Sequence, residues 1–169
     1  MPLYFAYGSN MDGAAMLRRC PHSKPLGPAR LMRHRFFVCA DGYASVARDP
    51  HRAVWGVLWD LALADVPALD RYESIATGLY LKTVLPVLTA RGPRRAMLYV
   101  ARSAAPGTPK ADYMEGVVAA AAAAGLPQAY RREIMSFVPG ARAAAEPADA
   151  PSVRPLWSAP TGVRRTARN

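Results

Sequence analysis

Short apolar runs, separated by turns rich in Gly, Asp and Pro, dominate the first hundred residues and predict strands. We expect strands at residues 3–7, 29–40, 43–48, 53–61, 79–89 and 94–101. The Asp41-Gly42 turn predicts a hairpin between the second and third of these, because Asp-Gly favours tight hairpin turns. Strand 53–61 is apolar on both faces, which suits a central position in a sheet or barrel, and its Gly56 predicts a bend or a close backbone approach.

Helical patterns lie between and after these strands. We expect helices at about residues 12–19, from about residue 65, at 112–124, and from 127 to a stop at Pro139-Gly140. Asn10 or Asp12 can cap the first helix, and Pro67 is tolerated in the first turn of the second because its missing N–H has no partner there.

The chain is predicted to form one domain over residues 1–140, followed by a tail. Residues 141–169 lose periodicity and are rich in Pro, Ala and Arg, which is typical of a flexible segment. Leu156 and Trp157 are the candidates for anchoring this tail.

Hydrophobic residues make up 51% of the 169 residues and charged residues 20%, an ordinary balance for a globular protein. No apolar window is long enough for a membrane span or a signal-peptide core, which favours a cytoplasmic protein without a membrane partner. Cys20 and Cys39 lack the spacing of a metal motif, and His22, His34 and His51 are scattered. We therefore expect no metal site and no disulfide framework.

The formal net charge of +10 raises the possibility of a nucleic-acid partner. However, the arginines are spread along the whole chain, and residues after Gly140 contribute five of them against two acidic residues. A nucleic-acid partner is disfavoured on this distribution.

Glu73 is the first candidate for chemistry. Val66, Leu69 and Glu73 fall at i, i+3 and i+7 of the second predicted helix, so the carboxylate shares a stripe with two apolar residues. A desolvated carboxylate has a raised pKa and can transfer protons near neutral pH. The same spacing also fits a rim residue, and the pattern alone does not separate the two.

The turn Tyr7-Gly8-Ser9-Asn10 follows the first strand and precedes a helix. Its glycine permits close backbone approach, and successive N–H groups at a helix start can hold a carboxylate or an oxyanion. A plain capping turn is the alternative, because Gly-Ser-Asn is common turn chemistry.

Several ordered motifs together resemble the γ-glutamylcyclotransferases. The resemblance covers about residues 3–139, and its motifs are "YFAYGSNM", "VWGVLW", "LDRYES" with "TGLY", and "GTPKADYMEGVV" with "GLPQAYRREI". It implies an α+β fold with a small mixed β-barrel flanked by helices and one pocket at the barrel mouth.

The resemblance also implies site residues. Tyr7, Gly8, Ser9 and Asn10 would grip the γ-glutamyl unit, and Glu73 would act as the base. Tyr80 and Tyr113 resemble pocket-lining tyrosines of the family and are further candidates for substrate binding. One departure is that the family commonly has Glu-Gly, whereas Ser74 follows Glu73 here; this could alter the local backbone and the leaving group accepted.

The implied reaction needs neither a metal nor a cofactor. The α-amine of a γ-glutamyl compound attacks its own γ-carbonyl, closing 5-oxoproline and expelling the attached amine. Glu73 would take the amine proton and return it to the departing nitrogen. The motifs do not identify the leaving amine, and they do not say whether the turn amides hold the oxyanion or the α-carboxylate.

The sequence leaves three alternative functions open. The closest is a cyclotransferase for a γ-glutamylated biosynthetic intermediate. The others are a binding module that holds a glutamyl-like ligand without turnover and an arginine-rich nucleic-acid accessory protein. A monomer and a homodimer are equally compatible with the sequence.

Overall fold

The computed structural model describes residues 2–141, so the predicted tail, including Leu156 and Trp157, lies outside the described residues apart from Ala141. The strands of the described part are β1 (Leu3–Ala6), β2 (Lys24–Val38), β3 (Ala44–Asp60), β4 (Tyr80–Thr89) and β5 (Gly92–Ala101). Its α-helices are α1 (Gly13–Arg19), α2 (Val66–Tyr72), α3 (Tyr113–Ala123) and α4 (Gln128–Met135).

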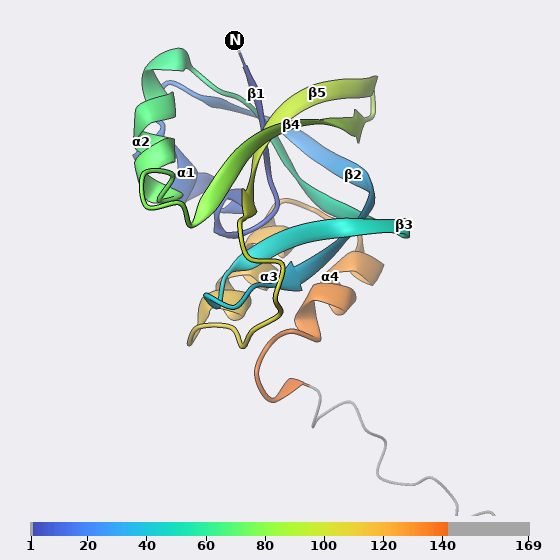
Figure 1. Cartoon of the computed structure of the whole chain (residues 1–169). Coiled ribbons are helices and arrows are strands. Elements are labelled where there is room, and N and C mark those ends of the chain that lie inside the picture. The colour runs from blue at the N-terminus through green and yellow to red at the C-terminus, as the bar shows by residue number, and fades with distance from the viewer. Residues whose placement is uncertain (1, 142–169) are drawn as a thin grey trace, which may run out of the picture.

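The five strands close into a barrel in the order β1-β3-β2-β4-β5 (Figure 1). The β1 strand pairs in parallel with β5, where Tyr4 lies opposite Met97, and the other pairs are antiparallel. The barrel is therefore mixed, and helices cover it on two sides. This confirms the predicted α+β class with a small mixed barrel flanked by helices.

One long strand, β3, replaces the two strands predicted at 43–48 and 53–61. Arg48 pairs with His34 and Ala53 with Met32, and the ladder is irregular between these two pairs. Pro50 lies in this irregular stretch, where its missing N–H removes no ladder hydrogen bond. The prediction of a break was therefore wrong, because the strand continues through the irregularity.

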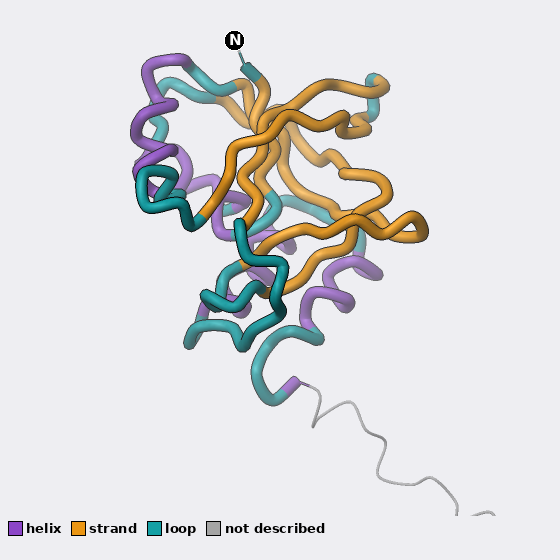
Figure 2. Tube along the Cα trace, viewed as in Figure 1, coloured by secondary structure: helices purple, strands orange, loops and turns teal. Residues whose placement is uncertain are grey.

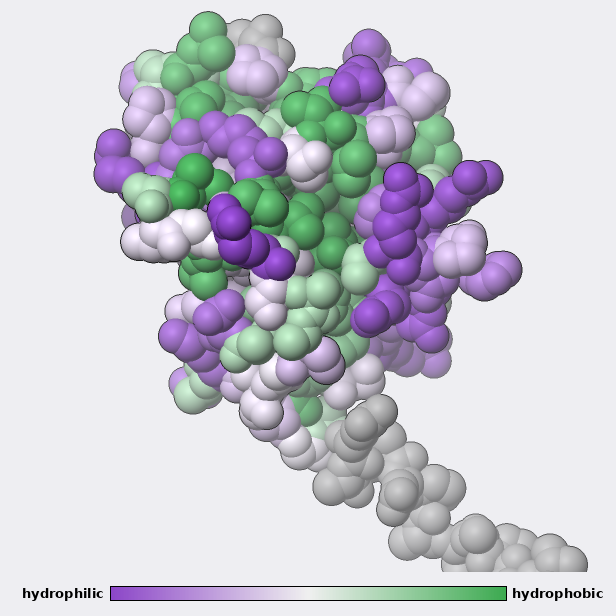
Figure 3. Space-filling model, viewed as in Figure 1, coloured by the Kyte–Doolittle hydropathy of each residue, from purple (hydrophilic) through white to green (hydrophobic). Residues whose placement is uncertain are grey.

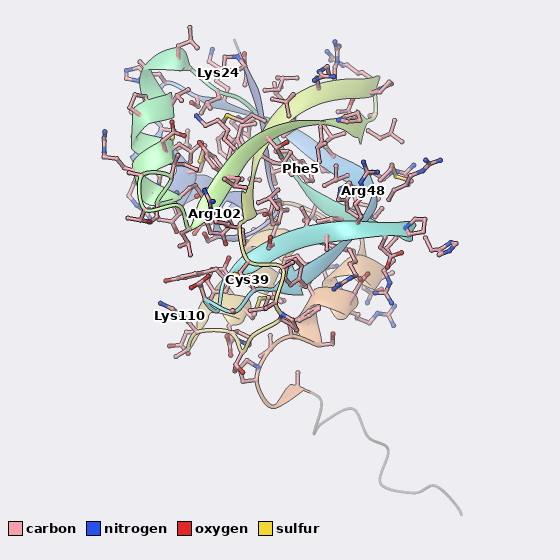
Figure 4. The ribbon with its side chains drawn as sticks, viewed as in Figure 1. Phe5, Lys24, Cys39, Arg48, Arg102 and Lys110 are labelled. Carbon is pink, nitrogen blue, oxygen red and sulfur yellow. The ribbon has the colours of Figure 1, made fainter. Side chains whose placement is uncertain are left out.

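β1 and β3 approach each other closely at Gly56. A Cβ atom at this position would lie 2.2 Å from the Ala6 carbonyl oxygen and 2.9 Å from the Phe5 ring. Phe5 is fully buried and points into the barrel interior (Figure 4). The predicted close backbone approach at Gly56 is confirmed.

The helices form two groups (Figures 1 and 2). α1 and α2 lie together on one flank of the barrel, and α3 and α4 lie beside the arm formed by β2 and β3. Ala120 and Ala121 of α3 and Ile134 of α4 are buried in the common core. α4 ends at Met135, before the predicted stop at Pro139, so the last turn is shorter than the sequence suggested.

The face shown in Figure 3 is uneven in polarity. Hydrophilic residues gather on the side where β2 and β3 run, and apolar residues reach the surface along β4. Leu81 and Val84 of β4 are each 47% exposed. Among residues 2–141, no helix has the length and apolar content needed to cross a membrane.

Candidate active site

All seven residues predicted for the site line one inner cavity of about 30 Å³. The cavity opens where β1 ends, α2 ends, β4 begins and α3 begins. Its complete lining is Tyr4, Tyr7, Gly8, Ser9, Asn10, Ala44, Glu73, Tyr80, Tyr99 and Tyr113. Tyr4, Ala44 and Tyr99 were not predicted.

The turn after β1 forms a short 3-10 segment at Ser9–Met11. Asp12, not Asn10, caps α1, and its Oδ1 accepts hydrogen bonds from the N–H groups of Ala14 at 2.9 Å and Ala15 at 3.1 Å. Of the two candidate capping residues, Asn10 and Asp12, it is therefore Asp12 that caps α1. The Asn10 side chain remains available to the cavity.

Gly8 allows the turn to pack against α3. A Cβ at this position would lie 3.0 Å from the Tyr113 hydroxyl oxygen and 3.3 Å from the Ala44 Cβ. Limited space is therefore one reason why glycine stands at this position.

Glu73 is the residue immediately after α2. Its N–H donates to the Leu69 carbonyl oxygen at 3.0 Å, which continues the helical direction by one residue. Its Oε1 accepts a hydrogen bond from Asn10 Nδ2 at 2.7 Å. Of the two orientations compatible with the sequence, the structure shows the inward one.

Burial raises the pKa of the Glu73 carboxyl from its ordinary value to about 7. The positive charge of Arg19 and the hydrogen bond from Asn10 act in the opposite direction and limit this rise in pKa. A carboxyl with this pKa exists in both protonation states near neutral pH, and it can therefore accept and donate a proton.

Arg19 is a site residue that the sequence analysis missed. Its Nη1 donates to Asn10 Oδ1, and its Cζ lies 3.3 Å from the centre of the Tyr72 ring. Because a guanidinium only donates hydrogen bonds, this contact turns the amide oxygen of Asn10 toward Arg19 and the amide nitrogen toward Glu73. The basic last turn of α1 was visible in the sequence, but only the fold brings it beside α2.

The tyrosines around the cavity are held by hydrogen bonds. Tyr7 donates to the Tyr99 carbonyl oxygen, and Tyr80 donates to the Ala44 carbonyl oxygen at 2.7 Å. The Tyr113 hydroxyl accepts from the Ala44 N–H at 3.1 Å. Burial raises the pKa of the Tyr7, Tyr80 and Tyr113 phenols, so all three are neutral at physiological pH.

Comparisons with known proteins agree with this geometry. The sequence profile of the AIG2-like family matches residues 53–134. The γ-glutamylcyclotransferase of Mus musculus is 29% identical over 153 residues, and that of Homo sapiens is 27% identical over 150 residues. Each alignment covers 81% of this chain and 79% of the relative.

A solved structure named γ-glutamyl cyclotransferase superposes with a TM-score of 0.73 at 25% identity, covering 79% of this chain and 85% of the other. In sequence and in fold, the chain is similar to γ-glutamylcyclotransferases. The resemblance noted in the sequence motifs is thereby confirmed over the 79% to 81% of the chain that these comparisons cover.

Ser74 follows Glu73 at the position where the resemblance implies a glycine. Its φ is +53°, a left-handed conformation that glycine adopts without strain and serine adopts at a cost. Its carbonyl oxygen accepts hydrogen bonds from the N–H groups of Thr77 at 3.2 Å and Leu79 at 3.3 Å. The backbone turn that follows Glu73 therefore forms with serine in place of glycine.

The site is not built like a metal centre. Within residues 2–141, no group of three or more His, Cys, Asp or Glu side chains is placed to hold a metal ion. The cavity combines one carboxyl, one amide and several phenols. Such a set can bind a small polar ligand and move a proton at Glu73.

Proposed function

We propose that this enzyme of the γ-glutamylcyclotransferase type converts a γ-glutamyl amino acid, peptide or amine into 5-oxoproline and the free amine. Its relatives carry the name of this activity. The observation that supports the proposal most strongly is the Glu73 carboxyl, which has a pKa of about 7 and lines the cavity beside Asn10.

The reaction is an internal exchange of one carbon–nitrogen bond for another. The substrate's α-amine attacks the γ-carbonyl carbon, a new C–N bond closes the five-membered ring, and the bond to the leaving amine breaks. Glu73 accepts the proton lost by the attacking nitrogen and returns it to the departing nitrogen. Atoms balance without water, because the proton moves from one nitrogen to the other.

The cavity would contribute orientation as well as proton transfer. Ring closure requires the flexible glutamyl chain to fold back, and positioning of this kind can supply about 7 kcal/mol or more in favourable intramolecular reactions. In this proposal Tyr7, Tyr80 and Tyr113 form the walls that hold the folded chain. The N–H groups of residues 8–10 would face either the oxyanion or the substrate α-carboxylate, and both assignments fit the turn.

The cellular compartment, the partners and the oligomeric state are also part of the proposal. We place it in the cytoplasm, whose reducing conditions suit the buried free thiols of Cys20 and Cys39. The substrate is a small γ-glutamyl compound, and no nucleic acid takes part. The protein acts as a monomer or a homodimer.

The test is release of 5-oxoproline from purified full-length protein given γ-glutamyl amino acids, γ-glutamyl amines and glutathione in turn. We expect turnover of at least one class, and the rates identify it. A γ-glutamylated biosynthetic intermediate should be included, because a related enzyme could prefer such a leaving group. Ligand binding without any 5-oxoproline would contradict the proposal and favour a binding module of the same fold.

A further inference from the structure

We infer that this protein has a second ligand site, which binds a small organic anion with an aliphatic body, such as a medium-chain carboxylate. The site is a cavity of about 410 Å³ lined by residues 31–34 of β2, Arg48 of β3, residues 85–88 of β4 and Pro93 of β5. It shares no lining residue with the cavity around Glu73. The inference therefore goes beyond the proposed function and does not depend on it.

The cavity lies where β2 and β4 separate. These two described strands are antiparallel and pair at one position, where Arg30 lies opposite Leu88. Beyond that pair β2 bends at Arg33, which has φ +58° and lies where the β2–β3 ladder shifts its register. Pro86 on the facing strand has no backbone N–H to donate. The two strands therefore do not continue their ladder, and the residues that follow the pair line the cavity instead.

The lining is mainly aliphatic on the β4 side. Leu31 and Val87 are each 1% exposed and belong to the barrel core, and Leu85 and Leu88 are half-buried. A volume of about 410 Å³ lies within the range of small-molecule sites, about 300–1,000 Å³. Aliphatic surface of this kind stabilises the apolar body of a ligand by removing it from water.

The β2–β3 side of the cavity is cationic. Arg33 and Arg48 are exposed, and no carboxylate is among the described residues that line the cavity. Arg48 lies opposite His34 in the β2–β3 ladder, so basic side chains crowd together there without an acidic neighbour in the lining. Figure 4 shows Arg48 on the arm formed by β2 and β3. An anion between these groups would relieve their repulsion.

Arg33 and Arg48 differ from the other arginines of the arm. Arg30 and Arg35 each lie over an aromatic ring, and Arg52 pairs with two carboxylates. Within residues 2–141, no ion pair or cation–π contact includes Arg33 or Arg48. A carboxylate would give these two guanidinium groups charge-assisted hydrogen bonds.

The two kinds of surface together define the ligand class. A neutral aliphatic compound would leave the guanidinium groups without a counter-charge, and an inorganic anion would leave the aliphatic lining exposed to water. A carboxylate with an aliphatic chain satisfies both surfaces. Its carboxylate lies between Arg33 and Arg48, and its chain lies along Leu85 and Val87.

Titration calorimetry of the full-length protein at low salt tests this inference. Octanoate is compared with octanamide, which lacks the charge, and with acetate, which lacks the chain. We expect octanoate to bind with a dissociation constant of about 1 mM or lower and at least about tenfold more tightly than either control ligand. Equal binding of octanoate and either control ligand, or no binding of octanoate at about 10 mM, would overturn the inference.

A pair of double variants locates the carboxylate. Arg33→Gln with Arg48→Gln should weaken octanoate binding by about tenfold or more and leave octanamide binding unchanged. Arg18→Gln with Arg71→Gln is the control, because these exposed arginines of α1 and α2 do not line the cavity and their loss changes the net charge equally. If the first double variant does not fold, Arg48→Gln alone should weaken binding by about fivefold. Equal loss in the variant and the control would contradict the assignment.

A second variant pair locates the aliphatic chain. Leu85→Gln should weaken octanoate binding by about fivefold or more, since it places a polar group in the lining. Leu81→Gln on the same strand is the control, because Leu81 is 47% exposed and does not line the cavity. Octanoate binding that is equally strong in both variants would contradict the assignment of the chain.

An anionic membrane surface offers related chemistry, and a separate measurement distinguishes it from a free ligand. The full-length protein is sedimented with phosphatidylcholine vesicles that do or do not contain phosphatidylserine. We expect octanoate added at saturating concentration to leave the bound fraction unchanged, because the free anion enters the cavity. Binding to phosphatidylserine vesicles by a protein that does not bind octanoate would overturn the inference and favour a membrane-docking face.

Discussion

At the scale of single residues, four side-chain contacts link the turn after β1, the end of α1 and the end of α2. Ser9 is hydrogen-bonded to Tyr72, Asn10 donates to Glu73, and Arg19 contacts both Asn10 and the Tyr72 ring. Asn10 and Glu73 are 63 positions apart in the sequence. The orientation of the Glu73 carboxyl therefore depends on Arg19 as well as on its direct partner.

Replacing Arg19 by Met removes this support. Because the Arg19 charge lowers the pKa of Glu73, its loss raises that pKa further. The acidic limb of the pH profile of kcat/KM should move to higher pH by on the order of one unit. Arg19→Lys should restore part of the shift by returning the charge, and Arg18→Met on the same helix is the control. If the acidic limb of the kcat/KM profile lies at the same pH in Arg19→Met and in wild type, Arg19 does not lower the pKa of Glu73.

Ser74 carries backbone strain that glycine would relieve. Left-handed φ costs a non-glycine residue about 1–2 kcal/mol, and the greater flexibility of unfolded glycine offsets about 0.5–1 kcal/mol of the gain. We expect Ser74→Gly to increase the free energy of unfolding in urea by about 0.5–1 kcal/mol. Ser136→Gly is the control, since Ser136 has φ −64° and should lose stability when replaced. Loss of stability in Ser74→Gly would show that the serine side chain compensates its strain.

At the scale of elements, the sequence predicted the site-bearing strands and helices better than their ends. The apolar run at 53–61 and the Asp-Gly turn at 41–42 correctly indicated paired strands. The long reach of β3 was not predictable, because Asp49-Pro50 resembles a break and only pairing with β2 carries the strand across it. Likewise α2 ends at Tyr72, and Glu73 turns inward through contacts with Asn10 that no local pattern contains.

The packing of β1 against β3 should be sensitive to any side chain added at Gly56. In Gly56→Ala the new methyl group would lie 2.2 Å from the Ala6 carbonyl oxygen, so β1 and β3 could not keep their spacing. We expect a loss of several kcal/mol in unfolding free energy, on the order of 3 or more, or failure to fold. The matched substitution Gly116→Ala, in open space within α3, should add about 0.5–1 kcal/mol. Similar unfolding midpoints for the two variants would contradict the packing argument.

At the scale of the whole molecule, barrel closure brings together residues from six segments of the chain at one cavity. The seven residues that the family resemblance implied, from Tyr7 to Tyr113, all line this cavity, and their roles in binding and catalysis stay predictions. Physical patterning alone left Glu73 and the turn open to two interpretations each. Arg19 and Tyr99 escaped prediction, since their contribution depends on packing between segments distant in sequence.

The stability of the whole protein should depend on pH, because the pKa of Glu73 changes on folding. Its pKa is raised from 4.5 to about 7 on folding, so the native state binds more protons than the unfolded state between these pH values. Stability therefore falls as pH rises through this window and does not recover above it. Thermal unfolding of wild type and Glu73→Gln should show the variant gaining on the order of 2 kcal/mol relative to wild type between pH 4.5 and pH 8. If the difference in stability between the two proteins does not change with pH, the pKa of Glu73 is not raised on folding.

The measurement that tests the central claim most directly is the rate of 5-oxoproline release by Glu73→Gln, with Glu115→Gln on α3 as the control. Glutamine retains the size of the side chain and the acceptor for Asn10, but it cannot carry the proton. We predict that kcat falls by at least about a hundredfold with KM little changed, and that the control behaves as wild type. A Glu73→Gln protein as fast as wild type would contradict the assignment of Glu73 as the base.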